Sequence, residues 1–338
     1  MKILERNFLK KSTRSVHASC VEFWNGYPVF SWFGGSKEGA QDVSIYVSNL
    51  HNEGKIIAIG NGDKIPRWNP ILFNHNDKLW LFEKAGIFCD RWQTFIHDMT
   101  DYKEGITEDD LMKKTQIIPA GLNGPVKTRP IIVGEDIICG SSVETFCDWA
   151  SYMESYRINT DNGKWDFVKR SNPIFPKSKE SYDFYGNTRT SLGLIQPALW
   201  QDDDGQIHSF FRSSRGHNNI FYSKLMNNGL WDAPVATNLP NPNSSVDVVF
   251  LDGRLFLVYN PDSNYRMPLN IAELAKRSDS KWEIVNEITV TNSINDTENN
   301  EQTFTDELSY PYMIGHDGRL HLTYTFGRTR IEYCVISV

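Results

Sequence analysis

The chain has 338 residues, of which 40% are hydrophobic, 13% aromatic and 23% charged, and its formal net charge is −7. This balance predicts a folded protein with a large apolar core and excludes wholesale disorder. The acidic charge, with no long block of Lys and Arg, argues against a nucleic-acid partner. The sequence also lacks the run of about 18 apolar residues that would cross a membrane, so no membrane partner is expected.

The cysteine pattern and the first residues bear on the cellular location. The first eleven residues alternate charged and apolar side chains and show no continuous hydrophobic run typical of a secretory signal. Five scattered cysteines without CxxC spacing favour reduced, buried thiols over a disulfide framework or a metal site. They are Cys20, Cys89, Cys139, Cys147 and Cys334. We therefore expect a cytoplasmic protein, with a phage-encoded or released protein as the alternative.

Short β-type runs separated by tight polar turns fill the chain, and one pattern recurs six times. Each copy has an apolar run, a turn, a second apolar run, a loop and a third run. The turns are 25–26, 76–77, 135–136, 204–205, 252–253 and 317–318. Most of them are Asn-Gly or Asp-Gly, which tolerate the positive φ angles of a two-residue hairpin. The second strands are expected at 28–33, 78–84, 136–142, 206–212, 254–260 and 319–325, and the third at 43–48, 94–99, 152–158, 220–225, 269–274 and 331–336.

Other features complete this pattern in chain order. Residues 3–9 form an isolated strand that we expect to complete the sixth copy, which has only three strands of its own. Residues 107–114 predict a short surface helix capped by Thr107. Trp165, Trp231 and Trp282 mark fourth strands of three copies, and the polar stretches 172–191 and 291–306 predict surface loops.

Six copies of a four-stranded antiparallel unit predict an all-β, six-bladed β-propeller that forms a single domain over residues 1–338. Closure by the N-terminal strand would remove an exposed sheet edge. A β-sandwich or a pair of β domains is the alternative architecture.

In such a propeller, the start of each inner strand and the loop between its second and third strands meet at one opening of the central channel. Eight cations are expected on this rim, although the chain as a whole is acidic: Lys84, Lys127, Arg129, Arg212, Arg215, Arg266, Arg328 and Arg330. Clustered cations repel one another unless an anion is bound, and the planar fork of arginine matches a carboxylate. This pattern predicts an acidic ligand. Because the aromatic side chains expected at the same rim suit stacking on a sugar face, an acidic oligosaccharide or polysaccharide is the partner that we expect.

Polar residues at the same inner-strand starts are further candidates for substrate contacts: Asn69, Gln196, Asn243 and Asp247. Support of the neighbouring loops is their alternative role. No pair of histidines stands at helical ligand spacing and no cysteine joins one, so we expect no metal and no cofactor.

Several long motifs resemble a known family. VHASCVEFWNGYPVFSWF, LIQPALWQDDDGQIHSFFRS, SYPYMIGHDGRLHLTYT and the Asp-box remnant NTDNGKW are similar to the sialidase-like propellers with BNR repeats, and the resemblance covers essentially the whole chain. It implies that Arg212 and Arg266 are two of the three arginines that hold a substrate carboxylate. It also implies that Tyr310 is the nucleophile and that Glu38 or Asp42 is the acid/base group.

Two positions depart from the family pattern. His17 stands where the first arginine is expected, and Gln196 stands where the family has the glutamate that activates the tyrosine. The histidine resembles another branch of the superfamily, whose members are lyases on uronic-acid units or cleave rhamnose linked to glucuronate. In a lyase, Arg212 and Arg266 would neutralise the uronate carboxylate, while His17 or Tyr310 removes the adjacent proton.

Three functions therefore remain open. The leading hypothesis is a glycoside hydrolase that cleaves a glycosidic bond at an acidic sugar in the manner of an exo-sialidase. The second is a histidine-dependent uronate lyase or rhamnosidase-type enzyme. The third is a non-catalytic propeller that binds acidic glycans, which the two departures would favour.

Overall fold

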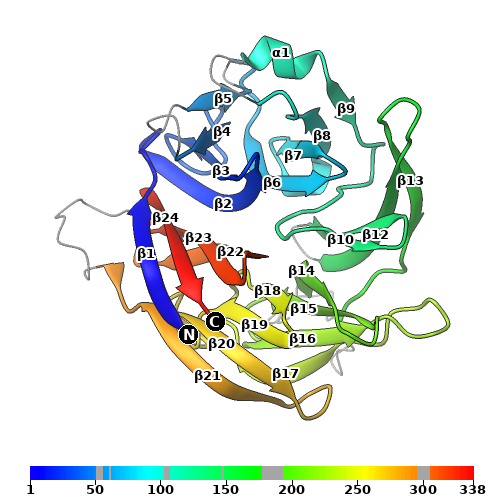
Figure 1. Ribbon diagram of the computed structural model, residues 1–338, viewed down its shortest axis with the longest axis vertical. Helices are drawn as coiled ribbons and strands as arrows, with labels where there is room; N and C mark the ends of the chain where they lie inside the picture. The colour runs from blue at the N-terminus through cyan, green and yellow to red at the C-terminus, as the bar shows by residue number, and fades with distance from the viewer. Residues whose placement is uncertain (51–55, 61, 103–106, 146–147, 177–192, 295–304) are drawn as a thin grey trace, which may run out of the picture.

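The computed structural model describes residues 1–50, 56–60, 62–102, 107–145, 148–176, 193–294 and 305–338. Six four-stranded antiparallel sheets stand around a common centre, and their innermost strands lie nearest the middle (Figure 1). The predicted six-bladed propeller is confirmed. The short alternating runs of the sequence form these sheets because each blade packs both of its faces on neighbouring blades.

The first three blades follow one another along the chain. The first contains β2 (Ser15–Trp24), β3 (Tyr27–Gly35), β4 (Ser44–Asn49) and β5 (Ile57–Ile59). The second contains β6 (Arg67–His75), β7 (Lys78–Ala85), β8 (Gln93–Asp98) and β9 (Thr115–Ile117). The third contains β10 (Ile131–Val133), β11 (Asp136–Glu144), β12 (Trp149–Ile158) and β13 (Trp165–Arg170).

The last three blades repeat the arrangement. The fourth contains β14 (Leu194–Gln201), β15 (Ile207–Ser213), β16 (Asn219–Lys224) and β17 (Val235–Pro240). The fifth contains β18 (Asp247–Leu251), β19 (Arg254–Tyr259), β20 (Leu269–Lys276) and β21 (Trp282–Thr291). The sixth contains β22 (Leu308–His316), β23 (Arg319–Phe326), β24 (Arg330–Ser337) and the N-terminal strand β1 (Lys2–Phe8).

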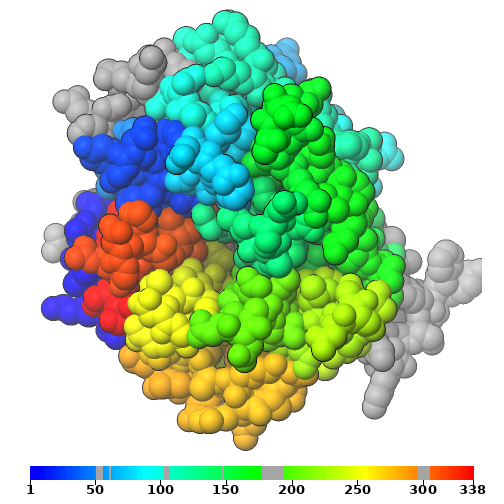
Figure 2. All heavy atoms as spheres, turned by 45° about the vertical axis from the view of Figure 1, so that its right-hand side comes forward, coloured from blue at the N-terminus to red at the C-terminus, as the bar shows by residue number. Residues whose placement is uncertain are grey.

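The ring closes as the sequence predicted. β1 pairs antiparallel with β24, so the two ends of the chain share one sheet. In Figure 2 the blue N-terminal atoms lie against the red C-terminal ones. The Phe8 ring meets Phe326 edge-on with centroids 5.4 Å apart, and the backbone N–H of Leu9 donates to the carbonyl of Ile331 at 2.9 Å. β1 therefore covers the backbone edge that β24 would otherwise expose.

Aromatic side chains fill the space between neighbouring blades. Trp165 at the start of β13 lies edge-on to the rings of Trp80 and Phe82 from the second blade, with centroids 5.6 and 5.0 Å apart. The Phe73 ring completes this contact at 6.2 Å. Trp165, which marks the fourth strand of the third blade, therefore packs that blade against the second.

Several local predictions need correction. The third hairpin turn is 134–135, because Val133 pairs with Asp136 and Gly134 supplies the positive φ of 62°. Trp231 forms only an isolated bridge to Leu225, and the fourth strand of that blade begins at Val235. The fourth-blade connection is a longer loop in which Asp202 accepts a hydrogen bond from the backbone of Gln206 at 2.8 Å.

The predicted helix is present and short. Helix α1 spans Glu108–Met112, and Thr107 and Asp110 cap each other reciprocally at its N-terminus. No helix of the described ranges is long and apolar enough to cross a membrane.

The structure describes four of the five cysteines and parts of the two predicted loops. Among the described cysteines, Cys20, Cys139 and Cys334 are buried and Cys89 is half-buried, and all four are free thiols. Most of the predicted loops 172–191 and 291–306, and Cys147, lie outside the described residues.

Candidate functional site

A repeated backbone irregularity shapes one opening of the channel. In the inner strands of four blades the register slips near the start of the strand, and one residue there adopts a left-handed conformation. These residues are Ala18, Asn69, Gln196 and Tyr310, with φ of 52°, 35°, 53° and 52°. Such bulges re-aim side chains, and non-glycine residues hold this conformation only at an energetic cost. Three of the four positions carry predicted site residues.

Tyr310 stands at the centre of this opening and receives two hydrogen bonds. Arg212 Nη1 donates to the Tyr310 hydroxyl oxygen at 2.7 Å, and Gln196 Nε2 lies 3.3 Å from the same oxygen. Arg212 also donates to Gln196 Oε1 at 3.1 Å. Arg212 Nε donates to the side-chain oxygen of Asn243 at 2.9 Å. Tyr310, Gln196, Arg212 and Asn243 thus form one hydrogen-bonded group.

Arg266 approaches the same place from the fifth blade. Its Nη2 donates to the backbone oxygen of Asn243 at 2.7 Å, so one asparagine holds both guanidinium groups. Its Nη1 lies 3.3 Å from Glu307 Oε2. Burial and the nearby charge of Arg212 lower the pKa of Arg266, and the carboxylate of Glu307 opposes this decrease. Arg212 and Arg266 are therefore close enough to act on one anion.

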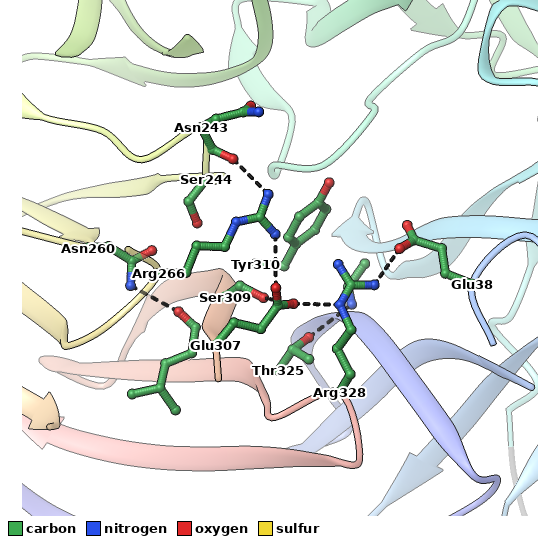
Figure 3. Close-up of polar contacts among 12 residues, drawn as sticks. Glu38, Asn243, Ser244, Asn260, Arg266, Glu307, Ser309, Tyr310, Thr325 and Arg328 are labelled. Carbon is green, nitrogen blue, oxygen red and sulfur yellow. Dashed lines mark hydrogen bonds and ion pairs between the residues drawn. The ribbon is translucent and has the colours of Figure 1, made fainter. Parts of the chain in front are cut away.

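A third arginine comes from the sixth blade. Arg328 Nε donates to Glu307 Oε1 at 2.7 Å, and Arg328 Nη1 pairs with Glu38. Figure 3 shows this chain of contacts from Asn243 through Arg266, Glu307 and Arg328 to Glu38, with Tyr310 beside it. Ser309 donates to Glu307 at 2.8 Å. Arg266 and Arg328 are thus each paired with a carboxylate, whereas the contacts of Arg212 within the described ranges are all to neutral groups.

His17 lies against the tyrosine and is fully enclosed. Its ring centroid is 4.1 Å from that of Tyr310, and neither ring nitrogen has a hydrogen-bond partner among the described residues. Burial lowers the pKa of His17 well below its ordinary value, and the charges of Arg328, Arg266, Lys127 and Arg212 lower it further. Burial and the charges of these four cations therefore favour the neutral imidazole of His17.

Not all of the predicted cations reach this opening. The predicted rim position of Arg129 is wrong, because Arg129 pairs with Glu22 at 2.9 Å and lines a separate cavity of about 270 Å³. Asp247 lines the same cavity, which is formed by the later halves of the inner strands and so lies toward the other opening. The backbone N–H groups of Val248 and Met313 donate to the Asp247 carboxylate, and burial raises its pKa to about 7.

The other cations also differ from the prediction. Lys127 lies within the channel, where it donates to the carbonyl of Pro311 at 3.0 Å and stands over the rings of Tyr310 and Tyr312. Burial lowers the pKa of Lys127 to about 8. Lys84 is buried on the carbonyl of Pro125, Arg215 is exposed, and Arg330 stands 4.0 Å from the centre of the Phe8 ring near the outer edge. Of the predicted cations, Arg212, Arg266 and Arg328 therefore lie at this opening, and Lys127 stands over the Tyr310 ring within the channel.

The two carboxylates proposed as acid/base groups have different surroundings. Both oxygens of Asp42 are held by Ser36, from its backbone N–H and its hydroxyl, each at 2.9 Å. Glu38 is exposed and paired with Arg328. The contacts of Asp42 are those of a residue that stabilises its own loop.

Asn69, a predicted substrate contact, occupies the bulge of β6 and is buried.

Replacing Asp42 by alanine is expected to lower stability by about 1 kcal/mol, the value of such loop hydrogen bonds, and to change turnover by less than about threefold, roughly 0.7 kcal/mol. Thermal unfolding and initial rates on the same preparation measure both effects. A loss of turnover beyond about a hundredfold, roughly 2.7 kcal/mol, in a protein with normal unfolding would show that Asp42 takes part in the chemistry.

Two acidic residues of the site were not predicted to act there. Glu307 precedes β22 and bridges Arg266 and Arg328. Glu144 ends β11, and the charge of Arg212 acts on it. An acid immediately before the inner strand of the sixth blade, on a rim where several arginines were expected, was the signal for Glu307.

A propeller of six four-stranded blades with tyrosine and arginines at one opening defines a sialidase-like propeller. The chain belongs to the BNR repeat-like domain family, which matches residues 29–322. A search of curated proteins by sequence found no match.

Solved structures share the fold at low sequence identity. A Dyadobacter fermentans protein of unknown function is 11% identical with a TM-score of 0.70, over 100% of this chain and 99% of that one. Trypanosoma rangeli sialidase in complex with sialic acid is 12% identical with a TM-score of 0.61, over 97% of this chain and 55% of that one. The subtype N10 neuraminidase-like protein of A/little yellow-shouldered bat/Guatemala/060/2010 is 9% identical with a TM-score of 0.56, over 99% of both chains.

Proposed function

We propose that this protein is a carbohydrate-active enzyme that cleaves a glycosidic bond at an acidic sugar, whose carboxylate is held by Arg212 and Arg266. One observation carries the proposal. Arg212 is buried, its described contacts are all to neutral groups, and one of them is the Tyr310 hydroxyl. None of these described contacts pairs the buried guanidinium directly with a carboxylate, and the charge of Glu144 nearby acts on it only through space. A bound carboxylate would supply a direct partner with bidentate geometry.

Tyr310 supports hydrolysis by its position. A tyrosine oxygen can attack the anomeric carbon of a carboxylate-bearing sugar without the repulsion that a carboxylate nucleophile would meet. The hydrogen bond from Arg212 at 2.7 Å favours negative charge on the oxygen as it loses its proton. A sialidase that was solved in complex with sialic acid shares the fold of this chain, which supports an acidic sugar as the substrate.

A second candidate is a propeller that binds acidic glycans without cleaving them. Gln196 favours this function, because its neutral amide touches the Tyr310 hydroxyl and, unlike a carboxylate, cannot take the proton of the tyrosine. The lyase hypothesis is disfavoured by the surroundings of His17. Its two nitrogens are buried, and the cations that lower its pKa would also oppose the imidazolium that forms when a base takes a proton.

The variant Tyr310→Phe separates the hydrolase from the binding module. We expect turnover of acidic-sugar aryl glycosides to fall on the order of a thousandfold, while the affinity for the acidic sugar changes by only a few fold. Tyr312→Phe is the matched control, because it removes another buried hydroxyl from the same strand, one that donates to the Leu72 carbonyl at 3.4 Å. Wild-type protein that binds acidic glycans through Arg212 but cleaves none would establish the binding module.

A further inference from the structure

The arginines of this opening and two of its carboxyl groups come from different blades. Arg212 near the end of β15 and the loop residues Arg266 and Arg328 belong to blades four to six, where Glu307 pairs with the last two. The corresponding loops of blades one and three supply Glu38 and Glu144, at or near the ends of β3 and β11. A sugar whose carboxylate meets Arg212 and Arg266 would therefore direct the opposite side of its ring toward carboxyl groups.

Glu144 lies near enough to Arg212 for the charge of the guanidinium to act on its carboxyl group. It pairs in the sheet with Trp149 at the start of β12, and the guanidinium carbon of Arg212 stands 5.4 Å from the centre of the Trp149 ring. Glu144 Oε1 is buried and has no hydrogen-bond partner among the described residues. A buried carboxyl oxygen without a partner is costly unless the group is protonated or a ligand contacts it.

The three carboxyl groups of the rim loops differ in their availability. Asp42 uses both oxygens within its own loop, and Glu38 is paired with Arg328. Burial raises the pKa of Glu144, the charge of Glu38 raises it further, and Arg212 opposes the change. Of the three, only Glu144 combines a buried oxygen that has no hydrogen-bond partner among the described residues with an environment that favours the protonated carboxyl group.

We infer that Glu144 is the acid that protonates the departing oxygen in the proposed glycosidic cleavage, an inference that rests on the proposed function. The glycosidic C–O bond breaks, its electron pair stays on the departing oxygen, and that oxygen takes the proton of Glu144. The Tyr310 oxygen bonds to the anomeric carbon and releases its proton to water. In the second step water attacks that carbon and gives a proton to the Glu144 carboxylate, and the tyrosine oxygen leaves and regains a proton from solvent.

The dependence on the leaving group tests this role. Glu144→Gln is expected to lose on the order of a thousandfold in turnover of acidic-sugar alkyl glycosides, whose leaving group needs a proton. With 4-nitrophenyl glycosides, whose leaving group needs none, we expect a loss of less than about tenfold in the first step, roughly 1.4 kcal/mol. The limb of the pH profile that falls toward alkaline pH should also disappear, because the variant has no proton to lose at this position.

Controls distinguish this role from a structural one. Glu38→Gln removes a carboxylate of the same rim and should show equal losses for the two kinds of leaving group. Glu144→Asp keeps the acid on a shorter side chain and should lose less than Glu144→Gln, with the same preference for aryl substrates. Thermal unfolding of each variant verifies the fold.

Two failures can be told apart. If wild-type protein cleaves the substrates but Glu144→Gln loses equally with both leaving groups, or loses nothing, Glu144 is not the acid and the proposed function stands. If wild-type protein cleaves neither substrate yet binds acidic sugar, the proposed cleavage and the role of Glu144 fail together.

Discussion

The variant Arg212→Ala is expected to lose binding of acidic sugars by about a hundredfold or more, which corresponds to about 2.7 kcal/mol. The reason is that Arg212 is the buried guanidinium whose described contacts are all to neutral groups. Its loss would also leave the Tyr310 hydroxyl with Gln196 alone. Titration calorimetry with a panel of acidic oligosaccharides and their aryl glycosides measures the affinity, and initial rates measure the accompanying loss of turnover.

Arg215→Ala is the matched control for this prediction. Arg215 follows the same strand, carries the same charge and is exposed to solvent. We expect its affinity for acidic sugars to match that of the wild type, because an exposed charge contributes little to a buried contact. Equal losses in the two variants would mean that general attraction by positive charge, rather than a specific grip by Arg212, controls binding.

Removal of residues 1–9 is expected to lower the melting temperature by about 10 °C, from a loss on the order of 5 kcal/mol. The deletion takes away the ladder with β24 and the contacts of Phe8 and Leu9. It also breaks the contacts of Arg6, which donates to Thr291 Oγ1 at 2.7 Å and lies 3.3 Å from Glu332. The measurement is thermal unfolding by circular dichroism.

Addition of the missing segment as a peptide gives the control for the deletion. A synthetic peptide of residues 1–9 should restore much of the lost stability by occupying the open edge of β24, whereas a scrambled peptide should not. The same melting temperature for the shortened and the full chain would contradict the closure of the ring by β1.

The sequence predicted the ring because the evidence for it is local. Asn25-Gly26 and Asp252-Gly253 require positive φ angles, and the structure has 50° and 79° at the first pair and 51° and 72° at the second. The tryptophan of β13 could likewise be placed from its neighbours in sequence. Such turns and inward aromatic residues fix where each strand begins, and six of them fix the number of blades.

The site was harder to predict because the opening that a side chain reaches depends on how far along the inner strand its residue lies. Lys127 and Arg129 are two residues apart, yet one touches the carbonyl of Pro311 and the other pairs with Glu22 toward the opposite opening. The bulges at Gln196 and Tyr310 shift the direction of side chains by an amount that no residue pattern reveals. Glu307 was missed for a related reason, since it lies just before the strand and reaches the site only through its arginine partners.

The central claim is that the arginines of blades four and five hold a carboxylate. The most direct measurement compares the affinity of the wild-type protein for an acidic oligosaccharide with that for the same oligosaccharide after reduction of its carboxyl group to an alcohol. We expect the acid to bind at least about a hundredfold more tightly, roughly 2.7 kcal/mol, and we expect Arg212→Ala to abolish this difference. Equal affinity of the acid and the alcohol for the wild-type protein would contradict it.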